Sequence, residues 1–336
     1  MKKLIVLATL AALPAVAMAD VTISGTVGVG IDNTKTGDLG SKNNMSRASG
    51  EVKFAGSEDL GNGLKAVWQV ANRIDPTGEE SNSWGGRDTF VGLKGSYGQV
   101  RFGKLSNPTN SGFSGNADVY TVIGLQGDGS YKLGEDRLKN AIRFDSAEVA
   151  GFKVAVAQQL KESSYTAGDK STTGTVSYGN GLGVSYNAGP VTLIYSGTNY
   201  KNTNLNSKGE KQNKAGSTYK TNQFTAQSSF GDIGVNFGYG DSKVKDNGTE
   251  TKTRGYGISA TYAIGAVTPM VGYWKESDSK VNGASQKNGY NVFSASVDYA
   301  LSKRTNAGVE FQKQSEGVAN AKDDKRIAAV YLVHNF

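Results

Sequence analysis

The sequence predicts an all-β protein whose strands close into a barrel that spans a membrane. Three observations lead to this prediction. Apolar and polar residues alternate along many short segments, the connections between the segments alternate between short and long, and the apolar faces are rich in aromatic residues. A period of two is typical of strands with one apolar face. After residue 19 no sustained 3.6-residue apolar stripe occurs, so helices are expected to contribute little.

The first 19 residues are set apart from this pattern. They begin with Lys2 and Lys3, continue through an apolar run over residues 4–16, and end on the small-residue sequence AMA. This is typical of a cleaved secretory signal peptide, and the run is too short to span a bilayer. We therefore expect an exported domain over residues 20–336. The chain has no cysteine, so no disulfide would stabilise it.

The segment DIGVNFGYG (232–240) illustrates the alternation. Ile233, Val235, Phe237 and Tyr239 share one face, whereas Asn236 and three glycines lie on the other. The same pattern predicts sixteen strands: 21–31, 50–56, 63–74, 86–95, 98–104, 139–146, 151–160, 173–187, 190–200, 219–230, 232–242, 253–264, 267–276, 289–300, 305–313 and 326–336.

Two architectures could produce sixteen such strands. A soluble all-β protein hides its apolar faces in a core, whereas a membrane barrel turns them to lipid and lines a wet interior with polar residues. A large soluble sandwich needs bulky residues in its core, but here the polar faces hold Gly, Ser, Thr, Lys and Arg. The lipid-facing positions named for such segments, for example Ile233, Val235 and Phe237, carry no formal charge. A Lys or Arg there would cost about 2–4 kcal/mol at the bilayer midplane. The even strand count and the alternating connection lengths also favour the membrane barrel.

The chain ends on an aromatic residue. Ala328, Val330, Leu332, His334 and Phe336 share one parity and are expected to face lipid on the last strand. That strand should pair with the first, because closure leaves no sheet edge exposed. Phe336 resembles the terminal aromatic signal that outer-membrane proteins present to their assembly machinery. His334, the single histidine, has no second histidine to act with it, and we expect a structural role.

Several segments, in order along the chain, carry a resemblance to a known family. They are GSEDLGNGLKAVWQV (56–70), WGGRDTFVGLKGSYGQVRFGKL (84–105), IRFDSAEVAGF (142–152), VTPMVGY (267–273), LSKRTNAG (301–308) and the terminal HNF, together with the signal-peptide region. With them the chain resembles the trimeric general porins of Gram-negative bacteria, of the neisserial, β-proteobacterial type.

The resemblance implies a 16-stranded antiparallel transmembrane β-barrel in the outer membrane, assembled as a homotrimer. It also implies that the third external loop folds inward and narrows a water-filled channel for passive diffusion of small hydrophilic solutes and ions. The sequence independently shows a long connection at residues 105–138, the expected constriction loop. Connections of this length are uncommon and usually functional.

Basic residues are the candidates for the pore wall. Arg87 and Arg137 match pore arginines of the family, although the simple parity of Arg87 falls with Val91 and Leu93, so a bulge or a late strand start must be assumed. The acidic candidates on the loop are Asp118, Asp128, Glu135 and Asp136, of which at least one is expected to face the basic wall. Strand parity nominates six lumen-facing residues: Lys53, Lys65, Arg101, Arg137, Lys139 and Arg143.

Charge predicts a weak anion preference. The chain has a formal net charge of +7, of which Lys2 and Lys3 in the signal peptide contribute two, which leaves +5. The family commonly has a basic residue where Glu51 aligns, so the preference should be weaker than in strongly anion-selective relatives.

Three other functions are compatible with a membrane barrel. A barrel enzyme would need a histidine base at the rim of the barrel. The single histidine, His334, is expected at the periplasmic end of the last strand, away from such a site, so no enzyme is expected. An adhesin or surface-interaction protein, acting through external loops such as 201–218 and 277–288, remains the alternative. A sugar-specific channel would need an aromatic ladder on the lumen parity, which is absent.

The expected partners follow from the channel prediction. They are two further copies of the chain, outer-membrane lipid and lipopolysaccharide, the barrel-assembly machinery, and permeating ions. Scattered lysines do not indicate nucleic-acid binding, and no metal-ligand spacing or phosphate-binding loop implies a cofactor or a metal.

Overall fold

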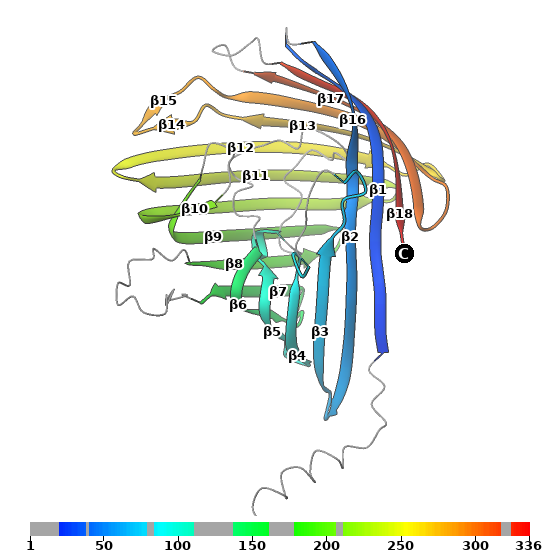
Figure 1. The fold of residues 1–336 in the computed structure, drawn as a ribbon, viewed down its shortest axis with the longest axis vertical. Helices are drawn as coiled ribbons and strands as arrows, with labels where there is room; N and C mark the ends of the chain where they lie inside the picture. The colour runs from blue at the N-terminus through cyan, green and yellow to red at the C-terminus, as the bar shows by residue number, and fades with distance from the viewer. Residues whose placement is uncertain are drawn as a thin grey trace, which may run out of the picture.

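The structure is a computed structural model that describes residues 20–37, 40–78, 84–110, 137–160, 178–205, 211–316 and 324–336. Almost all of these residues lie in antiparallel strands that join into one continuous barrel wall (Figure 1). The predicted signal peptide and most of the predicted constriction loop lie outside the described residues.

Sixteen long strands form the described wall, and each overlaps one of the sixteen predicted ranges, so the predicted fold is confirmed. A small hairpin, β14 (Lys280–Val281) and β15 (Ala284–Ser285), extends from it, and a 3-10 turn, η1 (Pro108–Asn110), follows β5. The wall strands are β1 (Asp20–Thr36), β2 (Ser41–Gly61), β3 (Leu64–Arg73), β4 (Thr89–Gly95), β5 (Gly98–Ser106), β6 (Arg137–Ser146), β7 (Phe152–Gln159), β8 (Tyr178–Ala188), β9 (Val191–Leu205), β10 (Lys211–Phe230), β11 (Ile233–Asp246), β12 (Thr249–Tyr262), β13 (Val267–Glu276), β16 (Tyr290–Ala300), β17 (Thr305–Glu316) and β18 (Lys325–Asn335).

The barrel closes where β1 pairs with both β2 and β18. At this seam the Gly25 N–H donates to the Phe336 carbonyl at 2.9 Å, and the Phe336 N–H donates to the Gly25 carbonyl at 3.0 Å. A Cβ on Gly25 would lie 2.6 Å from the Phe336 ring, so glycine is required for the ring to lie there. The last residue of the chain is therefore part of the ladder that seals the wall.

The two ends of the barrel differ in their connections. At one end, here called the turn end, lie the chain termini of the wall and the connections 62–63, 96–97, 147–151, 189–190, 231–232, 263–266 and 301–304. In the first of these turns Asn62 and Gly63 have φ of 52° and 76°, the left-handed pair that a two-residue hairpin favours. The other connections join strands at the opposite end, here called the loop end. One of them, Asn247-Gly248, is an equally tight turn.

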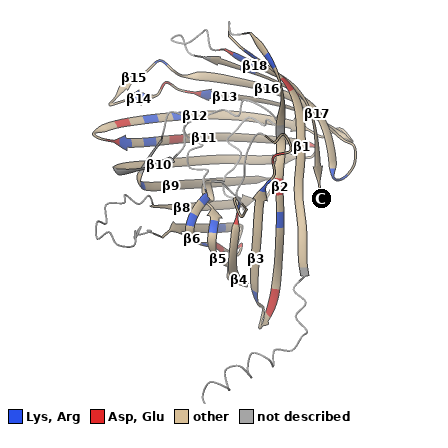
Figure 2. Ribbon diagram, viewed as in Figure 1, with Lys and Arg blue, Asp and Glu red and all other residues tan. Residues whose placement is uncertain are grey.

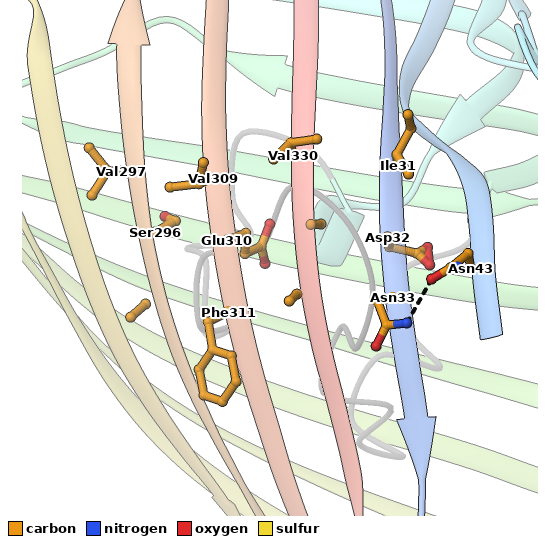
Figure 3. Close-up of a pocket in the computed structure, with 13 residues that line it drawn as sticks. Ile31, Asp32, Asn33, Asn43, Ser296, Val297, Val309, Glu310, Phe311 and Val330 are labelled. Carbon is orange, nitrogen blue, oxygen red and sulfur yellow. Dashed lines mark hydrogen bonds between the residues drawn. The ribbon is translucent and has the colours of Figure 1, made fainter. Parts of the chain in front are cut away.

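The wall is apolar outside and polar inside. On β17, Val309 and Phe311 are 52% and 44% exposed, whereas Glu310 between them is 4% exposed and turns to the barrel interior (Figure 3). Ser296 on β16 and Asp32 on β1 are buried on the same inner side. A shallow groove of about 480 Å³ lies across β1, β16, β17 and β18 at this place. The outward apolar face is the arrangement that the sequence predicted.

Candidate functional site

Charged residues gather at the wall segment formed by β2 to β6 (Figure 2). The short stretch before β4 is held against β3 rather than in a strand ladder. The Arg87 N–H donates to the Ala71 carbonyl at 3.0 Å, and the Gly86 N–H donates to the Asn72 side-chain oxygen at 3.3 Å. The Gln69 side chain donates to the Asp88 carbonyl at 2.8 Å. These bonds position Arg87 and Asp88 beside the first charged residues of β2.

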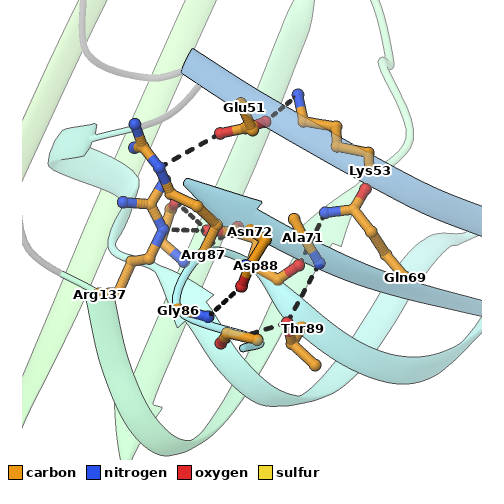
Figure 4. Close-up of polar contacts among 12 residues, drawn as sticks. Glu51, Lys53, Gln69, Ala71, Asn72, Gly86, Arg87, Asp88, Thr89 and Arg137 are labelled. Carbon is orange, nitrogen blue, oxygen red and sulfur yellow. Dashed lines mark hydrogen bonds and ion pairs between the residues drawn. The ribbon is translucent and has the colours of Figure 1, made fainter. Parts of the chain in front are cut away.

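Glu51 lies between two cations in the first charged group (Figure 4). Its carboxylate is 2.5 Å from the Lys53 ammonium and 3.4 Å from the Arg87 Nε. The Lys53 side chain is the most exposed of the three. Glu51 therefore offsets positive charge that Lys53 and Arg87 would otherwise present.

Asp88 is the centre of the second group. It accepts from the Arg137 Nε at 2.6 Å, from the Ser106 N–H at 3.1 Å and from the Ser106 hydroxyl at 2.5 Å. Hydrogen bonds of this kind stabilise the ionised carboxylate. They also fix Arg137 at the point where the chain enters β6.

Asp145 bridges two arginines in the third group. Arg101 on β5 and Arg143 on β6 are directly opposite in register, and each donates to Asp145, at 2.5 and 2.6 Å. The Arg143 Nη1 also donates to the Ser106 carbonyl at 2.7 Å, which joins this group to that of Asp88. The Arg101 guanidinium lies 5.1 Å from the centre of the Phe90 ring, within cation–π range. Arg143 is 3% exposed, so its charge depends on these partners.

The structure thus brings five of the predicted basic residues into one neighbourhood: Lys53, Arg87, Arg101, Arg137 and Arg143. They contact three carboxylates, Glu51, Asp88 and Asp145, so this set of eight residues keeps a net positive charge. We call these eight residues the arginine cluster. Their role in the pore remains a prediction.

Two predicted residues lie apart from the cluster. Lys65 is near the turn end of β3, six residues from Ala71, which corresponds to about 20 Å along the strand. Lys139 lies next to Asn140, which has φ of 47°. Leu138 pairs with Leu105 and Ala141 pairs with Gly103, so two residues of β6 face one residue of β5 there. This β-bulge breaks the alternation that placed Lys139 on the face of Arg143.

Five further predicted site residues, the four loop acids and Phe336, do not belong to the arginine cluster. The loop acids Asp118, Asp128, Glu135 and Asp136 lie outside the described residues. Phe336 lies at the seam described above.

The sequence reasoning missed two carboxylates of the cluster. Asp145 shares the parity of Arg143 two residues earlier, and that spacing is a signal that could have found it. Asp88 directly follows Arg87, but it lies before β4 begins at Thr89, so no parity argument applies to it.

Within the described ranges no helix has the length and apolar character to cross a membrane. Among the same residues no group of three or more His, Cys, Asp or Glu side chains is arranged to hold a metal ion.

A closed barrel with apolar residues outside and ion-paired charges inside defines a membrane channel. A sequence profile of the Gram-negative porins matches residues 6–317. The major outer membrane proteins P.IB of Neisseria gonorrhoeae and of Neisseria lactamica are each 30% identical to this chain over the full length of both proteins. The chain belongs to the Gram-negative porin family. It is an outer-membrane channel protein and not an enzyme.

Solved structures agree with this fold. The anion-selective porin from Comamonas acidovorans superposes with a TM-score of 0.77 at 20% identity, covering 95% of this chain and 100% of that one. The trimer form of OmpT from Vibrio cholerae superposes with a TM-score of 0.73 at 13% identity, covering 95% and 99%.

Proposed function

We propose that this porin conducts small hydrophilic solutes and ions by passive diffusion with a weak preference for anions. The observation that supports the preference is the arginine cluster, in which five cations contact three carboxylates. The structurally similar protein from Comamonas acidovorans is described as anion-selective, which is in line with the proposal.

The channel makes and breaks no covalent bonds. Its selectivity comes from the narrowest cross-section and from the charges that line it. At physiological salt the screening length is about 8 Å, so only charges close to the permeating ion act on it effectively. In the proposed mechanism the predicted loop acids face the arginine cluster across the constriction, and the resulting transverse field orients polar solutes.

The remaining elements of the proposal concern export and assembly. Residues 1–19 are removed as a signal peptide, and the loop 105–138 folds inward as the constriction. Three copies form a homotrimer, and Phe336 is part of the signal read by the barrel-assembly machinery. The turn end faces the periplasm and the loop end faces the cell exterior, as in outer-membrane barrels with short periplasmic turns. Outer-membrane lipid and lipopolysaccharide surround the barrel.

Planar-bilayer recording tests the proposal. In a KCl gradient the reversal potential should show preference for Cl⁻, and clear cation selectivity would contradict it. Current steps in multiples of three would support the homotrimer. Arg137→Ala should lower the anion preference more than Lys208→Ala, because Lys208 belongs to a predicted external loop, and equal effects would count against the site assignment.

The adhesin alternative is separated from the channel by liposome swelling. An open channel admits small sugars and the liposomes swell, whereas a plugged barrel would leave them unchanged.

A further inference from the structure

Four lysines lie side by side across four neighbouring strands near the loop end. Lys220 on β10 is opposite Lys243 on β11, Lys243 is opposite Lys252 on β12, and Lys252 is opposite Lys280 on β14. We call these residues the lysine row. Figure 2 shows the basic residues at the ends of β11 and β12 beside the β14–β15 hairpin.

The lysine row is on the outer face of the wall. Ser242 and Thr253, which precede Lys243 and follow Lys252 in the chain, are buried on the inner side. Tyr239 on β11 and Tyr256 on β12 share the parity of Lys243 and Lys252 and are exposed with the apolar outer surface. The lysines therefore point away from the pore.

The position of the row along the strands places it just beyond the hydrocarbon of the bilayer. Phe237 pairs with Ile258, and two residues further along the strands Tyr239 pairs with Tyr256. Aromatic girdles of this kind mark the interface of outer-membrane barrels. Lys243 is four residues beyond Tyr239, which corresponds to about 13 Å along the strand. This is the level of lipid headgroups.

Positive charges directly opposite each other on adjacent strands destabilise the sheet unless an anion lies between them. Glu250 supplies part of the negative charge that is needed. Its carboxylate is 2.8 Å from the Lys243 and Lys252 ammonium groups and 3.4 Å from that of Lys245. Neither Lys220 nor Lys280 forms an ion pair with a described carboxylate.

Other carboxylates nearby have other partners. Asp241 is opposite Arg254 in register and accepts from the Asn222 side chain at 3.1 Å. Asp278 accepts from the Ser285 hydroxyl at 2.7 Å and from the Gly289 N–H at 2.8 Å. The outer face at this level therefore retains an excess of positive charge.

A cleft of about 640 Å³ opens along the row. Lys243, Lys252, Arg254 and Lys280 line it, so four cations face two carboxylates, Asp241 and Asp278; Tyr239 and Ser285 add hydroxyl groups. Strands are about 4.8 Å apart, so four of them spread the lysines over about 14 Å. This length accommodates more than one phosphate group.

A second row of the same kind occurs elsewhere at the loop end. Lys313 on β17 is opposite Arg326 on β18, and Arg326 is opposite Lys35 on β1. Two residues toward the turn end, the same face carries Phe311 and Ala328. Cations in register beyond an apolar face are therefore a repeated feature of the rim.

We propose that the lysine row and its cleft bind the phosphate groups of a phosphorylated glycolipid headgroup in the outer leaflet. The inference rests on the proposed orientation, with the loop end toward the cell exterior. A lipid fits better than a soluble anion, because the apolar outer face continues directly below the row and would contact the acyl chains. The phosphate groups would complete the balance of the lysine and arginine charges that Glu250 leaves incomplete.

The test titrates the purified full-length mature protein in neutral detergent and follows bound lipid by native mass spectrometry. The probes are bisphosphorylated lipid A, the same lipid with its phosphates removed, and inorganic phosphate. The row variant carries Lys220→Gln, Lys243→Gln, Lys252→Gln and Lys280→Gln. A matched control removes four positive charges near the turn end, through Lys94→Gln, Lys153→Gln, Lys303→Gln and Arg304→Gln.

We expect the row variant to bind bisphosphorylated lipid A at least ten-fold more weakly than the parent, with the control within two-fold of it. The dephosphorylated lipid should bind the parent and the row variant equally. Equal affinity of the parent and the row variant for bisphosphorylated lipid A would overturn the proposal. So would tight binding of inorganic phosphate at the row, because the site would then serve a soluble anion.

Channel recordings separate this inference from the proposed function. The row variant should keep the conductance and reversal potential of the parent, since its side chains face away from the pore; this also shows that it has folded. If the parent protein showed no anion preference, the proposed selectivity would be refuted. The lipid-binding measurements would be unaffected by that outcome.

Discussion

The arginine cluster inside the wall and the lysine row outside it balance their charges in different ways. In the cluster, each of the five cations lies within 3.4 Å of one of three carboxylates. In the row, one carboxylate, Glu250, contacts two of four lysines. Burial explains the difference, because an uncompensated charge is costly where water is excluded and is tolerated where it is not. The inner cluster therefore uses the fixed fork of arginine, and the outer row uses hydrated, mobile lysine.

The largest expected effect comes from removing the carboxylate that Arg101 and Arg143 share. Asp145→Ala leaves two guanidinium groups directly opposite each other, one of them almost fully buried. We expect the free energy of unfolding to fall by about 3–5 kcal/mol, measured by urea unfolding in lipid vesicles. Glu148→Ala is the control, since it removes the carboxylate of an exposed pair with Lys153 at 3.1 Å and should cost less than about 1 kcal/mol. Equal losses would mean that Asp145, between its two arginines, contributes no more to stability than the exposed Glu148.

A smaller loss is expected when a cation is placed on the lipid-facing side. On β11, Phe237 lies between Tyr239, which pairs with Tyr256, and Ile233, which pairs with Tyr262. It is therefore near the middle of the outer face. Phe237→Arg should lower the free energy of unfolding by about 2–4 kcal/mol in the same assay. Asn236→Arg puts the same charge at the same depth on the inner side and should cost less. A larger cost for Asn236→Arg would contradict the assignment of the two faces.

Removing Glu51 should sharpen the selectivity of the pore. Glu51→Gln frees Lys53 and Arg87 from their counter-charge. A unit charge about 8 Å from an ion changes its energy by about 0.5 kcal/mol in water before screening, which is at most about a two-fold change in local anion concentration. The reversal potential in a KCl gradient should move toward that of Cl⁻. Glu58→Gln, on the same strand about 23 Å away, should leave it unchanged.

The smallest expected effect is a local pH dependence in the loop-end segment that follows β13. The Ser285 hydroxyl and the Gly289 N–H, both donating to Asp278, hold the pKa of that carboxyl below its ordinary value; desolvation opposes this effect, and the charge of Lys287 adds to it. A lowered folded-state pKa stabilises the segment above the ordinary carboxyl pKa. That contribution is lost as the pH falls through the lowered value.

The Gly289 amide chemical shift should therefore titrate with a midpoint below about 3.9, and Asp278→Asn should abolish the titration. A midpoint at or above 3.9 would show that these hydrogen bonds do not favour the ionised form.

The sequence predicted the sixteen strands because lipid contact imposes an apolar residue at every second position. For β2 it marked only the central part of the strand. The predicted range 50–56 is the middle of β2, which runs from Ser41 to Gly61. The first residues of that strand, SKNNMSRASG, are polar and carry no alternation. Strand ends beyond the bilayer are thus invisible to a hydropathy pattern.

The candidate site was predicted less completely for two physical reasons. Parity fails at a β-bulge, and Asn140, a residue type that tolerates the left-handed conformation, separates Lys139 from Arg143 in this way. Parity also does not apply before a strand begins, and Arg87 and Asp88 precede Thr89, the first residue of β4. The partner of each arginine depends on contacts between strands, which no single segment of sequence contains.

The seam between Gly25 and Phe336 makes the last residue of the chain a structural part of barrel closure. Every other pair of wall strands joins segments separated by one connection, whereas this pair unites the two extremities of the mature polypeptide. A product cut short by even a single codon would lack both hydrogen bonds of Phe336. The eleven register pairs from Thr26–Asn335 to Thr36–Lys325 would remain in such a product, so the loss would shorten the closing ladder at the turn end without opening the wall.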